Sequence, residues 1–230
     1  MKRQELLWWD VVILSVIFFG TAIYGSTMAF FGTGAEMQSS GVEFTAADNW
    51  FAMGTTLVKL ALGYLYLRLR HFDFSRWSYR ITGKGTILAV GFFLLLSVIF
   101  DLADILLYGW ESATAHVGQG IGQGNFDFLL QLTDPSLILF SLLNGVYEEI
   151  FFLGICTVVA KKQLPWMLLY SLVIRFAFHT YQGLMPALEI GFLMGILYLL
   201  LYRKSDRNLY PFMLSHAFAD MIGIGILILL

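Results

Sequence analysis

Seven apolar runs, separated by shorter polar stretches, dominate the pattern of the chain. They have the roughly 20 residues that a helix needs to cross a bilayer, and they lack the alternation of barrel strands. Because lipid offers the backbone no hydrogen-bond partners, such runs predict spanning helices. We therefore predict an all-α fold, a polytopic transmembrane helical bundle of about seven spans. The runs cover residues 7–31, 50–68, 85–109, 135–160, 164–182, 185–202 and 209–230.

The composition supports a membrane protein. Of the 230 residues, 58% are hydrophobic and 13% are charged, whereas about a quarter of a soluble domain is charged. The net charge of −2 gives no indication of a nucleic-acid partner, so we expect none, and we expect membrane lipid around the helices. Cys156 is the single cysteine, which excludes an intramolecular disulfide.

The basic residues are distributed unevenly between the two ends of the runs. If the N-terminus is cytoplasmic, 12 of the 14 Lys and Arg residues fall on the cytoplasmic side, and the other two, Lys59 and Arg175, lie within apolar runs. The positive-inside rule then predicts a cytoplasmic N-terminus and an external C-terminus. The first apolar run lacks a clean cleavage site, so we interpret it as a retained helix rather than a signal peptide.

The chain shows no internal repeat and no stretch typical of a soluble domain. We predict a single membrane domain over residues 1–230, with three N-terminal helices and their loops in 7–133 and a four-helix half in 135–230. Gly191 and Gly195 form a GxxxG pattern in the sixth run, which predicts close packing of that helix against a neighbour.

Two adjacent carboxylates, Glu148 and Glu149, stand in the middle of the fourth apolar run. An ionisable group at bilayer depth costs at least a few kcal/mol, so such groups face the bundle interior or a wet cavity. In an α-helix the two side chains point about 100° apart, so one can face a cavity while the other anchors a neighbouring helix. One of them can act as a general base. The structural alternative is an ion pair with Arg175 or Lys59.

Three further polar residues lie in the same half of the chain. His179 is in the fifth run, and His216 and Asp220 share one face of the seventh because they are four residues apart. With the glutamates, this set could activate a water for amide hydrolysis, and a second imidazole could stabilise the oxyanion. It could also bind zinc through Glu and two His, or only join helices through hydrogen bonds.

Several motifs resemble those of the CPBP family, the CAAX proteases and bacteriocin-processing enzymes, also called the Abi family. The segment Glu148–Gly154 is similar to the EExxxR signature, and Phe176–His179 lies where the family places its FxxxH motif. Gly191–Tyr198 resembles the Gly-rich helix that follows, and Asn208–Asp220 resembles the closing HxxxN/D motif. The order and the spacing match over roughly residues 135–225.

The resemblance implies an intramembrane endopeptidase in the bacterial cell membrane, acting on a peptide or protein substrate that is lipidated or plain. It implies that Glu148 and His179 activate the water, that His216 and Asp220 form the oxyanion site, and that Glu149 supports the pair. The best-understood members are regarded as glutamate-type proteases, so we expect no cofactor and no metal, with zinc as the less favoured alternative.

The sequence departs from the family pattern at two positions. Leu153 stands where the signature has Arg, and Arg175 stands where the FxxxH motif has Phe. We hypothesise that the cation has moved to the neighbouring helix, where Arg175 pairs with Glu149 or Glu148. An ionised Asp220 cannot donate to an oxyanion as Asn does, so it must be protonated or serve to orient His216.

Two alternative functions stay open. A family member that has lost its chemistry could act as a membrane interaction or immunity protein, and Leu153 supports this alternative. A small ion-coupled transporter could use the two glutamates with Asp101 and Asp104 as a relay, although a salt bridge from these aspartates to Lys59 is the favoured interpretation.

Overall fold

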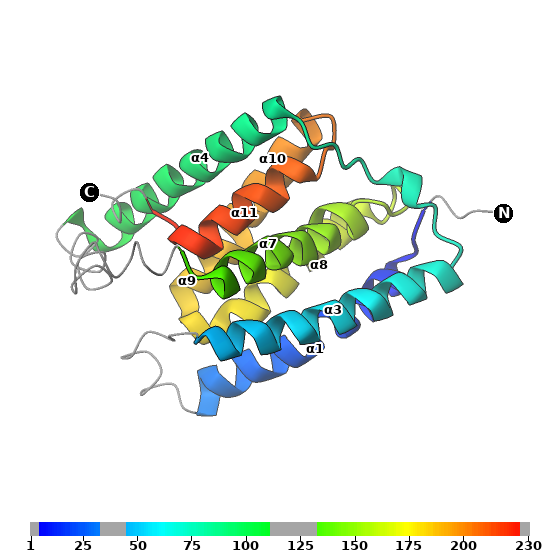
Figure 1. Cartoon of the computed structure of the whole chain (residues 1–230), viewed down its shortest axis with the longest axis horizontal. Coiled ribbons are helices and arrows are strands. Elements are labelled where there is room, and N and C mark those ends of the chain that lie inside the picture. Colours follow the sequence, from blue (N-terminus) through cyan, green and yellow to red (C-terminus); the bar gives the residue numbers. More distant parts are fainter. Residues whose placement is uncertain (1–4, 33–44, 111–132, 226–230) are drawn as a thin grey trace. The chain divides into compact units, whose positions relative to one another are not determined.

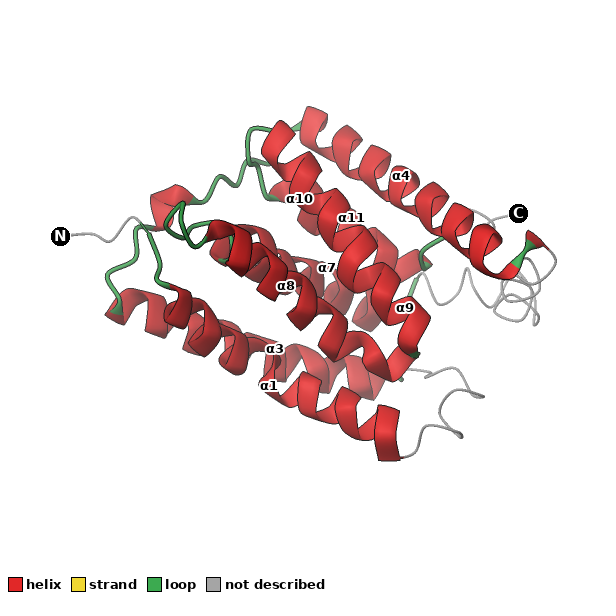
Figure 2. Cartoon of the chain, turned by 180° about the vertical axis from the view of Figure 1, so that it is seen from behind, coloured by secondary structure: helices red, strands yellow, loops and turns green. Residues whose placement is uncertain are grey.

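The structure is a computed structural model that describes residues 5–32, 45–110 and 133–225. Across these three ranges the chain is helical and contains no strand (Figure 2). The α-helices are α1 (Trp8–Gly32), α3 (Ala46–Leu69), α4 (Gly83–Tyr108), α7 (Pro135–Glu149), α8 (Leu164–His179), α9 (Leu184–Leu188), α10 (Gly195–Lys204) and α11 (Tyr210–Ile222). Two 3₁₀ turns, η1 (Phe74–Arg76) and η3 (Thr180–Gln182), and two π-helices, η2 (Ile150–Ile155) and η4 (Glu189–Met194), complete the list.

The all-α prediction for a membrane protein is confirmed. Within the described ranges, five helical stretches are long and apolar enough to cross a membrane: Trp8–Gly32, Ala46–Leu69, Gly83–Tyr108, Pro135–Ile155 and Leu184–Lys204. The fifth and seventh predicted runs contain the shorter helices α8, of 16 residues, and α11, of 13 residues. The total of seven spans and the cytoplasmic N-terminus therefore stay predictions.

Local sequence signals set several helix ends. The side chain of Thr82 accepts a hydrogen bond from the Gly85 amide at 3.0 Å and caps α4. At α7, the Asp134 carboxylate accepts from the Ser136 amide at 2.8 Å. The last predicted run does not continue as one helix within the described residues, because α11 ends at Ile222 and Gly223 adopts φ 89°.

The described residues pack as two compact units. Among the described residues, the first comprises 5–32, 45, 54–79 and 147–209, and the second comprises 46–53, 80–110, 133–146 and 210–225. Both α3 and α7 contribute residues to each unit, and the boundary in α7 falls immediately before Tyr147 (Figure 1). The predicted single domain, with a division near residue 134, is not tested by this packing.

A cluster of buried aromatic rings forms the core of the first unit. Phe18 stacks on Tyr147 with ring centroids 4.9 Å apart, and Phe19 stacks on Phe178 at 4.6 Å. Phe19 also contacts Phe152 at 5.2 Å. These contacts fasten α1 to the end of α7, to η2 and to α8, so a helix outside the predicted motifs packs directly on the helices that carry them.

The GxxxG prediction is confirmed in the same unit. A Cβ added to Gly191 would lie 2.7 Å from the Cα of Phe176, and one added to Gly195 would lie 2.6 Å from a methyl carbon of Leu172. Because real Cβ atoms do not approach backbone atoms so closely, position 191 needs glycine, whereas a side chain at position 195 would require the Leu172 side chain to shift. The two glycines allow η4 and the start of α10 to lie directly against α8.

The second unit is built around α4 and α11, which lie side by side in both views (Figures 1 and 2). Phe92 of α4 stacks on Phe212 of α11 with ring centroids 4.9 Å apart. The α7 part of this unit also packs closely on α11, because a Cβ at Gly145 would collide with the carbonyl oxygen of Met213. A tyrosine hydroxyl adds a polar contact, since Tyr210 and Thr86 lie 2.9 Å apart.

Candidate active site

The two adjacent glutamates end α7, where the helix changes from α to π geometry. Glu148 has 4% of its surface exposed and Glu149 has none. The π-helix η2 begins at the next residue and runs to Ile155. Such segments are frequent at functional sites because they redirect side chains that an α-helix would carry elsewhere. The signature-like segment Glu148–Gly154 therefore lies across an irregular part of the helix.

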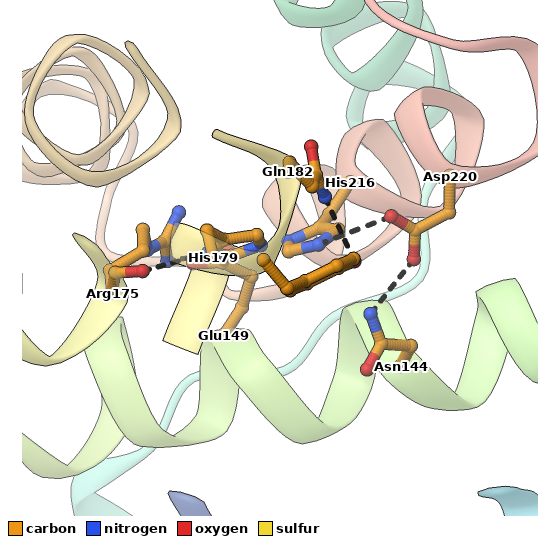
Figure 3. Close-up of polar contacts among 8 residues, drawn as sticks. Asn144, Glu149, Arg175, His179, Gln182, His216 and Asp220 are labelled. Atoms are coloured by element: carbon orange, nitrogen blue, oxygen red, sulfur yellow. Dashed lines mark hydrogen bonds and ion pairs between the residues drawn. The ribbon is translucent and has the colours of Figure 1, made fainter. Parts of the chain in front are cut away.

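Arg175 of α8 forms an ion pair, as predicted from the sequence. Its Nη2 donates to Oε1 of Glu149 at 2.8 Å, and its side chain is 2% exposed. The guanidinium also lies over the ring of Phe152, 4.1 Å from the ring centre. The prediction of pairing with Glu149 or Glu148 is confirmed for Glu149. Figure 3 shows this pair beside His179.

His179 is the last residue of α8, and its hydrogen bond fixes one of its ring nitrogens. Nδ1 lies 2.7 Å from the backbone carbonyl oxygen of Arg175. Because a carbonyl oxygen can only accept, we assign the proton of the neutral ring to Nδ1. Nε2 then carries the lone pair, which is the form that a histidine needs to accept a proton.

In the second unit, α11 carries His216 and Asp220 as predicted from their spacing. The Nε2 of His216 lies 3.6 Å from Oδ1 of Asp220, with 5% and 25% of the two side chains exposed. Asn144 was not among the site residues predicted from the sequence. Its Nδ2 donates to Oδ2 of Asp220 at 2.9 Å (Figure 3). Its only signal in the sequence was a carboxamide in an apolar run, four residues before Glu148.

Residues from outside the motifs also hold the π-helix and α8 in place. The indole of Trp77 donates to the carbonyl oxygen of Gly154 at 3.1 Å, and a Cβ at Gly154 would lie 3.3 Å from that indole nitrogen. The hydroxyl of Ser26 in α1 donates to the carbonyl oxygen of Phe178 at 2.6 Å. The hydroxyl of Tyr147 donates to the carbonyl oxygen of Phe18. The first two contacts satisfy backbone carbonyls close in the chain to the glutamates and to His179, and the third is made by Tyr147, the residue before Glu148.

Each unit therefore holds a part of the predicted residue set. In the first unit, Arg175 binds Glu149 through its guanidinium and His179 through its backbone carbonyl oxygen, and Glu148 precedes Glu149 in the chain. In the second unit, Asp220 contacts both His216 and Asn144. The catalytic roles of these residues stay predictions. Among the residues that the structure describes, no group of three or more His, Cys, Asp or Glu side chains is arranged to hold a metal ion, and the chelation experiment below tests zinc.

Comparison with protein families tests the resemblance that the motifs indicated. Residues 131–222 match the family described as type II CAAX prenyl endopeptidase, Rce1-like. This stretch belongs to the CAAX protease family. The recognition made from the motifs is thereby confirmed, and the CAAX protease stretch contains all five predicted catalytic residues together with Asn144 and Arg175. No curated protein and no solved structure matches the chain.

The family match adds function at a general level. CAAX proteases act on a protein or peptide and are associated with membranes, in agreement with the apolar helices of this chain. Helices α1, α3 and α4 lie outside the matched stretch. Through Phe178 and Tyr147, α1 therefore contacts the matched stretch from outside it.

Proposed function

We propose that the protein is an intramembrane endopeptidase that cleaves a peptide bond with water activated by Glu148 and His179. The observation that carries the proposal is the hydrogen bond from His179 to the Arg175 carbonyl oxygen, because it leaves Nε2 able to accept a proton. The match of residues 131–222 to a protease family supports the same reaction class.

In this mechanism Glu148 takes a proton from water while the water oxygen attacks the peptide carbonyl carbon, and His179 holds the water through Nε2. His216, oriented by Asp220, stabilises the oxyanion that forms on the carbonyl oxygen. The intermediate then collapses, the carbon–nitrogen bond breaks, and the proton on Glu148 passes to the leaving amine. Glu149 takes no part in proton transfer, because Arg175 holds it as an ion pair.

The proposed substrate is a membrane-associated protein or peptide. The family name includes prenyl endopeptidases, which favours a lipidated C-terminal segment over a plain one. A prenyl chain would bring such a segment to the bilayer by its apolar surface. The proposed location is the bacterial cell membrane.

The test uses the full-length protein purified in detergent and offered prenylated and plain peptides. We expect Glu148→Gln and His179→Ala to lower kcat by about 100-fold to 10,000-fold, the usual contribution of general acid–base catalysis. The matched control is Glu189→Gln, since Glu189 also lies in a π-helix of the first unit and has no assigned role. Cleavage that survives both changes contradicts the assigned mechanism, and inhibition by a chelator that zinc reverses favours the metal alternative.

Leu153 supports one other function, an inactive family member that acts through membrane interactions. Its side chain is 1% exposed, so the position of the signature's arginine is filled here by a buried apolar group. Under this alternative the wild-type protein cleaves none of the peptides, while variants of Arg175 still change its stability.

A further inference from the structure

Asn144 makes a hydrogen bond whose direction can be assigned from chemistry. Its Nδ2 lies 2.9 Å from Oδ2 of Asp220. An amide nitrogen donates and does not accept, so Oδ2 of Asp220 must be the acceptor. Oδ2 is therefore the acceptor in this arrangement, and its position is set by a residue of α7.

The other oxygen of Asp220 is turned toward His216. Oδ1 lies 3.6 Å from the ring nitrogen Nε2, which is within the range of an ion pair and slightly beyond that of a hydrogen bond. If Asn144 holds Oδ2, rotation of the carboxylate cannot remove Oδ1 from His216 without breaking the bond to Asn144 (Figure 3). Through these two contacts, a residue of α7 sets the orientation of the Asp220 carboxylate, and the carboxylate in turn faces the imidazole of His216.

The backbone explains how a side chain as short as that of Asn reaches α11. The next residue is Gly145, where a Cβ would collide with the Met213 carbonyl oxygen and would lie 3.2 Å from the amide nitrogen of Ala217. Next to Asn144, the backbones of α7 and α11 therefore approach so closely that only glycine fits between them. This close approach brings the carboxamide within hydrogen-bond distance of Asp220.

We propose that Asn144 is a positioning residue that fixes the proton of neutral His216 on Nε2. With Asp220 ionised, the oxygen that faces Nε2 can only accept, and Asn144 keeps it there. The other ring nitrogen, Nδ1, then carries a proton only when the ring holds both. It follows that His216 can donate to an oxyanion through Nδ1 only as the imidazolium ion.

This proposal answers the question that Asp220 raised in the sequence. An ionised Asp220 cannot donate to an oxyanion, and in the proposal it is instead the acceptor that orients the histidine. Only the catalytic consequence rests on the proposed function. The assignment of the tautomer is a property of the folded protein and can be measured without a substrate.

The experiment is ¹⁵N NMR of the full-length protein with labelled histidine, with the His216 signals assigned by His216→Gln. We expect the wild type to show Nε2 protonated, and Asn144→Leu, which keeps the size but removes the donor, to show a mixture of tautomers. The double variant Asn144→Asp/Asp220→Asn exchanges donor and acceptor. The new amide at position 220 donates to the new carboxylate at position 144, and the amide oxygen then faces Nε2 of His216 as an acceptor. We expect it to recover the wild-type tautomer.

Asn49→Leu is the matched control. Asn49 is another buried carboxamide of the second unit, whose Nδ2 donates to the Ser136 hydroxyl at 3.1 Å. Its loss removes a bond of the same kind, and we expect no change in the His216 tautomer. If Asn49→Leu alters the tautomer as much as Asn144→Leu does, the effect is general loosening and the proposal is wrong.

Peptide cleavage supplies a second measurement. Asn144→Leu should lower kcat by about tenfold to a hundredfold, the range found when the orienting partner of a functional histidine is removed, with KM little changed, and the double variant should recover most of the loss. An unchanged tautomer in Asn144→Leu overturns the inference even if activity falls. If the tautomer shifts as expected while the wild type cleaves no peptide, the positioning role stands and the proposed function fails.

Discussion

In the first unit, Arg175 and Glu149 meet at 2.8 Å with 2% and 0% of their side chains exposed, whereas in the second unit Asp220 accepts from Asn144 with 25% of its side chain exposed. A buried charge that loses its partner is expensive, because no water replaces the lost contact. A partly exposed group is hydrated when its partner is removed, so loss of the partner mainly changes the orientation of that group. The comparison suggests that the first pair holds the fold and the second directs a reactive group.

The surroundings of the two pairs differ in the same sense. Phe152 lies under the guanidinium of Arg175, and it is packed in turn against Phe19 of α1. The Asn144 bond instead depends on a backbone contact at Gly145, where the two helices touch. The ion pair of the first unit is therefore surrounded by large packed side chains. The position of Asn144 in the second unit depends instead on a residue without a side chain, Gly145, where the two helices touch.

Arg175→Leu tests the first half of this comparison and should have the largest effect. It leaves the Glu149 carboxylate buried without its partner, so we expect the free energy of unfolding to fall by about 3–5 kcal/mol. The measurement is denaturant unfolding in mixed micelles. The control is Arg175→Leu/Glu149→Leu, which removes both charges and should recover much of the loss.

A swap variant tests whether Arg175 replaces the arginine that the signature has at position 153 as the cation that pairs with the glutamates. Leu153→Arg/Arg175→Phe moves the cation back to the fourth apolar run and should restore most of the stability and activity that Arg175→Leu removes. A harmless Arg175→Leu, or a swap that restores neither quantity, would show that the cation has not moved between the helices.

Gly145→Ala tests the second half and should have an intermediate effect. The added methyl group meets the Met213 backbone, so α7 and α11 must separate, and overpacking of this kind costs about 1–3 kcal/mol. We expect the separation also to break the Asn144–Asp220 bond and to change the His216 tautomer. Gly191→Ala should cost a similar amount of stability, because it meets the Phe176 backbone in the first unit, but should leave that tautomer unchanged.

Gly91→Ala is the matched control for both glycine variants. A Cβ at Gly91 of α4 meets nothing within 4 Å, so alanine should be neutral or slightly stabilising through its better helix propensity. A tautomer that shifts in Gly191→Ala as it does in Gly145→Ala would mean that the two regions are not separate in the way proposed.

The sequence was sufficient to predict the features that depend on local pattern. The apolar runs gave the helices, the GxxxG pattern gave the close approach of η4 to α8, and the cost of a lone buried cation gave the pairing of Arg175. In each case the physical rule needs only residue type and spacing. The family motifs added the stretch that the comparison matched.

The features that depend on packing were missed. Glu148 and Glu149 were placed by α-helical geometry, and the π-helix that begins at Ile150 has no signal in the residue pattern. The role of Asn144 was missed because it follows from the contact of Gly145 with another helix. The contribution of α1 was missed because its aromatic residues fit equally well in an ordinary apolar span.

Ser26→Ala gives the smallest expected effect. It tests whether α1 helps to position His179 or only packs against the other helices of the first unit. The Ser26 hydroxyl donates to the Phe178 carbonyl oxygen at 2.6 Å in a buried setting, so its loss should cost about 1 kcal/mol of unfolding free energy. The exposed bond of Ser75 to Asp73, at 2.9 Å, is the control, and Ser75→Ala should be close to neutral because water replaces it.

If α1 helps to place His179, which follows Phe178, Ser26→Ala should also lower kcat for peptide cleavage slightly while KM is unchanged. A loss of stability with an unchanged kcat would limit α1 to holding the unit together.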